Sequence, residues 1–348
     1  GIPIVWGISA TVERFNRAMA GAVKRITLPD VTVDAAKVQE SGLIKDTILI
    51  DIPQDSTGDF DTVLVRRGTN KLKAITEAWA EYAARQEDEV SVTPLMVLQV
   101  PNTPDPNDIG RALDTIYQQW PELPSGSVAH VFGDHTTQRF GNRDVPYIQP
   151  ETVQDSTWVR ILVAKDAIST GWDCPRAEVM VSFRPAKDKT HITQLLGRMV
   201  RSPLARRIAG DDRLNAVDCL LPKFDAKTVD QVVDALKSGD ETAGTSTGRV
   251  LVNPMEMSPN PAISDSVWQA FEALPSQSRP QRGAKPAKRL TALAHELAAD
   301  DILEGAGRKA HAALHKALDT LQAEQKAAIE AKRKAVLTVD GKTVVADM

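Results

Sequence analysis

The stretch VMVSFRPAKDKTHITQLLGRMV, residues 179–200, decides the fold. It opens with a short run of apolar and β-branched residues, 179–183, which is typical of a buried strand. Its second half, 192–200, repeats apolar residues every three to four positions, as an amphipathic helix does. Similar apolar runs lie on either side, at 159–163 and 217–221. Strands of this kind separated by helices are typical of a parallel sheet covered on both faces.

The same alternation extends over residues 24–238 and predicts one three-layer α/β domain. We predict strands over residues 47–52, 95–100, 128–132, 159–163, 179–183 and 217–221. We predict helices over residues 71–85, 108–120, 192–200 and 229–237.

The two ends of the chain differ from this central region. Residues 2–8 (IPIVWGI) have a buried-strand pattern with no lead-in, so we expect a piece of a longer protein that begins inside a sheet. Residues 239–286 are rich in Ser, Thr, Pro and Gly, which predicts a linker. Residues 287–348 are predicted to form a helical extension, divided into two helices at Gly305 and Gly307.

The composition limits the class of protein. The chain has 348 residues, of which 42 % are hydrophobic and 25 % charged, as in soluble globular proteins. It has no apolar run of about 18 residues, so we expect no membrane span. Its two cysteines, Cys174 and Cys219, cannot form a disulfide framework or a four-ligand zinc site. We therefore expect a cytoplasmic protein without a structural metal.

The charge is unevenly distributed. The whole chain carries 42 Lys and Arg against 46 Asp and Glu, a net charge of −4, whereas residues 159–213 carry eleven cationic against six anionic residues, a local balance of +5. A concentration of positive charge favours phosphate binding whatever the average over the chain. Arg184, Lys187 and Lys189 are candidate contacts to a nucleic-acid backbone, although a solvated basic loop explains any single one of them as well.

Gln194, Arg198 and Arg201 are spaced i, i+4 and i+7, so a helix projects all three from one face. Two guanidinium groups beside an amide suit a phosphate chain, because their planar donors bind phosphate oxygens in pairs. The alternative is a solvated basic helix face with ordinary ion pairs.

The segment AISTGWD, residues 167–173, follows a predicted strand. Thr170 and Gly171 offer a hydroxyl and an unobstructed backbone amide to an anion, and Asp173 can accept from a ribose hydroxyl or orient the arginines. We expect this segment at the carboxyl ends of the strands, where open α/β sheets bind ligands. The alternative is an ordinary Thr-Gly turn.

Together with the tripeptide Ser9-Ala10-Thr11, these two segments resemble, in order, the later motifs of superfamily-two helicases, the last in the form QxxGRxxR. A finer resemblance, over residues 1–238, is to the motor subunit of type III restriction enzymes and related phage-defence helicases. The residues that carry it are SGLIK at 41–45, PLMVLQVPN at 94–102, the block 168–207 and the stretch 214–224.

The resemblance implies that residues 24–238 are the second RecA-like lobe of a helicase or translocase and that residues 1–23 are the tail of the first. Arg201 would be the arginine finger, Arg198 a second contact to the γ-phosphate, and Gln194 a residue that positions water or couples the lobes. The resemblance further implies a nucleotide-binding role for Gly171 and Asp173, and a role in coupling to DNA for Ser9, Thr11 and Thr170.

The implied cofactors are ATP and Mg²⁺, held mainly by the first lobe. The chain has neither a GxxxxGK[ST] loop nor an Asp-Glu box, so we do not expect this stretch alone to hydrolyse ATP. It also shows no nuclease constellation. The implied partners are double-stranded DNA, the first lobe of the same parent chain and a methyltransferase subunit.

Two other interpretations remain. One is a non-catalytic nucleic-acid-binding or docking module with a helicase-like fold. The other is a different doubly wound enzyme, such as a nucleotide-sugar transferase, which explains the fold but not the arginine pattern of the QxxGRxxR helix.

Overall fold

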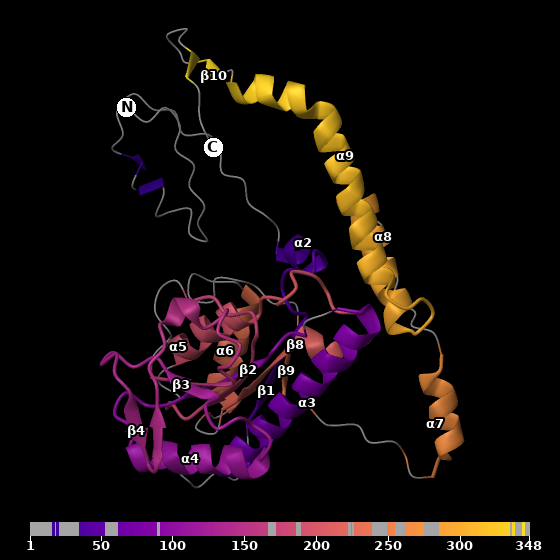
Figure 1. Cartoon of the computed structure of the whole chain (residues 1–348). Coiled ribbons are helices and arrows are strands. Elements are labelled where there is room, and N and C mark those ends of the chain that lie inside the picture. Colours follow the sequence, from indigo (N-terminus) through magenta and orange to yellow (C-terminus); the bar gives the residue numbers. More distant parts are fainter. Residues whose placement is uncertain are drawn as a thin grey trace. The chain divides into compact units, whose positions relative to one another are not determined.

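The computed structural model (Figure 1) describes residues 16–17, 19–20, 35–52, 62–88, 91–165, 172–185, 189–221, 224, 226–238, 249–254, 260, 262–274, 285–334, 336–337 and 343–344. The chain divides into two compact units, which are described separately. The first comprises Gly1–Glu81 and Ser91–Glu272, and the second comprises Tyr82–Val90 and Ala273–Met348.

The first unit is built on a seven-stranded parallel sheet of order β3-β6-β2-β7-β8-β1-β9. Its strands are β1 (Thr47–Asp51), β2 (Leu95–Gln99), β3 (Val128–His130), β6 (Ile161–Ala164), β7 (Ala177–Ser182), β8 (Ala216–Leu220) and β9 (Arg249–Val252). All six predicted strands are present, with ends within two residues of those expected. The prediction of an α/β fold on a parallel sheet is therefore confirmed, and the sheet is compatible with a RecA-like lobe.

Helices cover both faces of this sheet (Figure 1). On one face lie α5 (Lys189–Met199) and α6 (Ala226–Ser238), whose apolar residues pack into one core cluster with the strands. The other face carries α3 (Thr62–Gln86) and α4 (Pro106–Gln119). The arrangement follows from right-handed crossovers between parallel strands.

Helix α3 begins nine residues before the predicted start at residue 71. A glycine within it, Gly68, lowers the helical propensity of this first part. The structure gives the reason for that glycine, because a Cβ atom there would lie 2.6 Å from Val181 Cγ2. Close packing of α3 on the sheet therefore needs a residue that weakens the helical signal.

The segment predicted as a linker contains part of the sheet. Strand β9 lies within residues 239–286 and pairs in parallel with β1, so the predicted boundary of the lobe at residue 238 is too early. The same segment contains the helix α7 (Asp265–Glu272). A second pair of elements that the sequence did not predict is the antiparallel hairpin of β4 (Gln138–Phe140) and β5 (Arg143–Val145).

The second unit consists mainly of two helices, as predicted for the extension at residues 287–348. They are α8 (Pro286–Ala299) and α9 (Ala306–Lys334), and Gly305, with φ of 62°, lies between them. The contact between them is made by small residues, among them Ala294, Ala298 and Ala306. The first unit also contains a short helix, α2 (Ala35–Glu40), and the second a small antiparallel pair, β10 (Val336–Leu337) with β11 (Thr343–Val344).

Candidate functional site

Arg201 and Asp173 form the ion pair around which the candidate site is built. Arg201 follows the end of α5, and its Nη1 lies 2.5 Å from Asp173 Oδ2. Both side chains are open to solvent, at 55 % and 46 % exposure. An exposed pair of this kind contributes at most about 1 kcal/mol to stability, so either group can exchange its partner for a ligand at low cost.

Arg198 joins the same place from one turn earlier in α5. Its Nη1 lies 3.5 Å from the backbone carbonyl oxygen of Trp172, the neighbour of Asp173. Partial burial lowers the pKa of Arg198, an effect that Asp173 opposes and Arg201 reinforces. The guanidinium nevertheless stays protonated, because the pKa of arginine is far above neutral. Two cations and one carboxylate thus converge, as the helical spacing predicted for the arginines.

This cluster lies at the amino-terminal edge of the sheet. Arg201 forms a β-bridge with Ile44, three residues before β1, and Asp173 lies four residues before β7. We expected the segment 167–173 at the carboxyl ends of the strands, and for Asp173 that expectation is wrong. Asp173 precedes β7, and the start of β7 lies at the edge opposite the end of β6.

Trp172 directly precedes Asp173 and is buried in the core cluster of α5 and α6. Its burial identifies it as a core residue that fixes the position of Asp173.

Arg184, a predicted contact to a DNA backbone, is buried at the carboxyl edge of the sheet. Its Nη1 donates 2.9 Å to Asn102 Oδ1 and also contacts the carbonyl oxygen of Lys165. These partners follow β2 and β6, whereas Arg184 follows β7. The guanidinium therefore ties three neighbouring strand ends together and does not lie on an exposed nucleic-acid track.

Two further arginines of the basic segment have internal roles. Arg176 is buried and donates to backbone carbonyl groups at the amino edge. Arg160 donates to Pro94 O and Thr76 Oγ1, and burial together with nearby Arg176 lowers its pKa to about 10. The positive balance of residues 159–213 thus overstates the charge that the segment presents to solvent.

Several predicted site residues cannot be placed. Ser9, Thr11, Thr170, Gly171 and Lys187 lie outside the described residues. Gln194 and Lys189 belong to α5, but their side chains lie outside what the structure describes.

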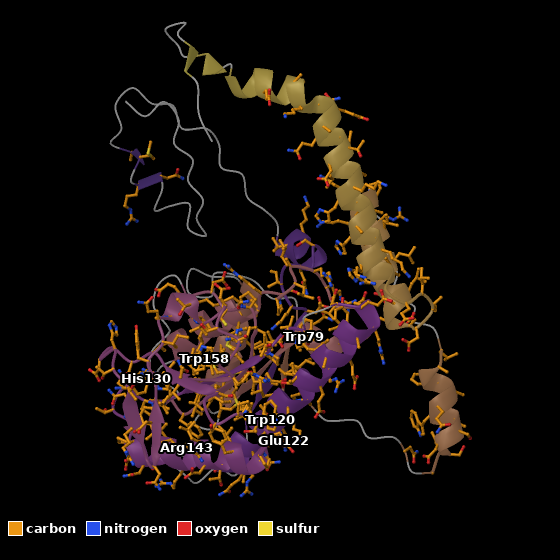
Figure 2. All side chains as sticks on the ribbon, viewed as in Figure 1. Trp79, Trp120, Glu122, His130, Arg143 and Trp158 are labelled. Atoms are coloured by element: carbon orange, nitrogen blue, oxygen red, sulfur yellow. The ribbon has the colours of Figure 1, made fainter. Side chains whose placement is uncertain are left out.

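The sequence did not predict the buried polar network that Lys45, Glu178 and Trp79 form next to the site. Lys45 Nζ lies 2.8 Å from Glu178 Oε1, and Trp79 Nε1 donates 2.7 Å to Glu178 Oε2. Trp79 is labelled on α3 in Figure 2. Charged side chains are normally exposed, and Lys45 lies two residues before β1. The only indication in the sequence that it is buried was the apolar character of the strands around it.

The described parts of the chain contain no group of three or more residues suited to hold a metal ion. His311 is spaced to share a metal with His315, but its Nε2 lies 3.1 Å from His295 Nε2. His295 Nδ1 in turn lies 3.0 Å from Gln86 Oε1, so these side chains form a hydrogen-bonded chain within the second unit. Among the described helices, none is long and apolar enough to cross a membrane.

A comparison with models of known protein families found no match, and a search of curated proteins found no similar sequence.

Proposed function

We propose that the first unit is the second RecA-like lobe of an ATP-dependent motor that acts on double-stranded DNA, of the kind found in type III restriction enzymes. The parallel sheet, the sequence resemblance and the convergence of two arginines on one carboxylate support this proposal. The observation that carries it is the Arg201–Asp173 pair with Arg198 beside it at one edge of the sheet.

In this proposal the first lobe binds ATP with Mg²⁺ and presents the γ-phosphate to Arg201. The Arg201 guanidinium leaves Asp173 and binds the phosphate oxygens, where it stabilises the charge that develops during transfer to water. Because its ion pair with Asp173 is exposed, breaking the pair costs little. Arg198, held at the Trp172 carbonyl, adds a second positive charge from the same helix face.

The opening and closing of the Arg201–Asp173 pair would report the nucleotide state to the lobe. Asp173 lies four residues before β7, and Arg201 is bridged to the segment that leads into β1. A change at the γ-phosphate therefore reaches two strands of the sheet at once. A docking module without a motor would keep the same pair as a permanent surface contact.

The test is the natural protein that carries both lobes, with Arg201 replaced by Ala or by Lys. We expect Arg201→Ala to lower DNA-stimulated ATP hydrolysis by about 10³- to 10⁵-fold, as arginine fingers do. Lys should restore little, because it lacks the planar pair of donors. Binding of DNA should change much less than the turnover number.

Arg139→Ala is the matched control, since Arg139 forms an exposed ion pair with Asp144 on the β4–β5 hairpin. Its hydrolysis rate should match that of the wild type. A wild-type rate in Arg201→Ala would refute the arginine-finger role and favour the docking module.

A further inference from the structure

The Lys45–Glu178 pair is buried almost completely, at 2 % and 0 % exposure. Removing two charges from water costs several kcal/mol for each ion, and their attraction in the core roughly offsets this cost. A well-packed apolar pair would stabilise the fold as well or better. Fold stability therefore gives a weak reason for this pair, and its contacts point to another.

A β-bulge directs Glu178 toward Lys45. In the pairing of β2 with β7, Leu95 lies opposite Ala177 and Met96 lies opposite Val179, so Glu178 is the extra residue. Bulges turn a side chain away from the regular alternation of a strand. Here the carboxylate receives both the Lys45 ammonium group and the indole N–H of Trp79.

Lys45 contacts both chain segments that carry the candidate site. Its backbone N–H donates 2.6 Å to the carbonyl oxygen of Val200, the residue before Arg201. Its Nζ donates 3.3 Å to the carbonyl oxygen of Pro175, two residues after Asp173. One side chain and its own backbone thus connect the end of α5 with the approach to β7.

We propose that Lys45 is a positioning residue that sets the separation of Arg201 and Asp173 through its buried contact with Glu178. This inference rests on the proposed function. Lys45 itself touches no nucleotide. Its contacts hold the end of α5 and the segment before β7 in place, while Arg201 moves between Asp173 and the γ-phosphate. A misplacement of about 1 Å at a reacting group can cost about 10² in rate, so a small shift of either segment is sufficient.

The experiment is a double-mutant cycle of Lys45→Met and Arg201→Ala in the natural two-lobe protein. We expect Lys45→Met to lower kcat for DNA-stimulated ATP hydrolysis by about 10²-fold, with KM for ATP changed much less. In the Arg201→Ala background the same substitution should lower kcat no further, because the group that it positions is already absent.

Lys71→Met is the matched control. Lys71 forms an ion pair with Asp218 at 2.6 Å, between α3 and β8. Its loss should affect stability but leave kcat at the wild-type value.

Equal loss of kcat from Lys45→Met in both backgrounds would overturn the proposal, because it would show an effect independent of Arg201. The same conclusion would follow if a folded Lys45→Met variant kept the wild-type kcat. If Lys45→Met does not fold, the cause is the buried Glu178 carboxylate that has lost its cation. The double substitution Lys45→Met with Glu178→Leu removes that carboxylate as well. We expect it to fold and still lose kcat; a wild-type kcat in that protein would also overturn the proposal. The Arg201→Ala arm alone tests the proposed function, so the two failures are distinguishable.

Discussion

Replacement of Arg176 by Met would remove a buried guanidinium that joins the amino ends of three strands. The side chain is 2 % exposed and lies between segments that precede β2, β6 and β7. Its nitrogen atoms donate to the carbonyl oxygens of Gln154 at 3.0 Å, Thr93 at 3.1 Å, Val159 at 2.9 Å, Val153 at 2.6 Å and Ser156 at 2.8 Å.

The size of the effect follows from those carbonyl groups. The oxygens of Val153 and Ser156 also accept backbone N–H groups, so the loss is concentrated on the other three. Each buried acceptor left without its donor costs about 1–3 kcal/mol. Relief of the desolvation of the guanidinium, which lowers the pKa of Arg176, offsets part of this sum. We therefore expect Arg176→Met to lower the free energy of unfolding by about 3–5 kcal/mol.

Urea denaturation followed by tryptophan fluorescence measures this difference. The melting temperature should fall by roughly 6–20 °C, on the scale of about 2–4 °C for each kcal/mol in a domain of this size. Arg176→Lys should recover little, because one ammonium group cannot replace five hydrogen bonds to carbonyl groups on two segments. Arg139→Met, at an exposed ion pair, should change stability by less than about 0.5 kcal/mol. A loss below about 1 kcal/mol in Arg176→Met would refute the reasoning, since it would show that the carbonyl groups find other donors.

Two further predictions concern stability. His130, labelled in Figure 2, is buried, and burial lowers its pKa from 6.5. Its Nδ1 accepts a hydrogen bond from the backbone N–H of Phe132, and protonation of Nδ1 breaks that bond. The unfolded chain therefore binds the proton more readily than the folded one. Stability should fall as the pH drops below about 6.5. His130→Phe should flatten this dependence between pH 7 and 5 in urea denaturation, and an unchanged slope would contradict the assignment. Gly42→Ala should cost more than about 2 kcal/mol, because φ is 76° and the new Cβ would lie 2.2 Å from Arg207 N. Gly126→Ala, with nothing within 4 Å of its Cβ, should be neutral in the same assay, and equal losses in the two would contradict the steric argument.

The sequence predicted the central strands well because both faces of the sheet are covered. Burial on both faces gives uninterrupted apolar runs, as in Ile161–Ala164, which stand out in any context. Strand β9 lacks this property, since it lies at the edge of the sheet and its four residues are partly exposed. Its short RVLV run sits among Ser, Thr and Pro, whose average composition predicts a linker.

The candidate site was predictable to the extent that it depends on one helix. The i, i+3 spacing of Arg198 and Arg201 fixes their common face whatever the rest of the fold does. The edge at which Asp173 meets them was not predictable, because it depends on the position of Asp173 relative to the start of β7. Lys45 and Glu178 meet across more than 130 positions of sequence through a bulge, and no local pattern predicts such a pair.

Whether each arginine of the basic segment is buried or exposed also depends on tertiary structure. Burial decides whether its guanidinium group can bind a ligand or binds only groups of the fold. Arg176 and Arg184 are buried at opposite edges of the sheet and bind carbonyl and amide oxygens of the fold. Arg201, Arg207 and Arg213 are exposed and lie near the amino edge, close to the starts of β7, β1 and β8. Each of these three guanidinium groups forms an ion pair with a carboxylate. Its positive charge is therefore available to a phosphate only when that ion pair opens. Within the basic segment, these three exposed guanidinium groups therefore lie at the edge proposed for the nucleotide. Mutations of these three residues should alter ATP turnover more than DNA affinity.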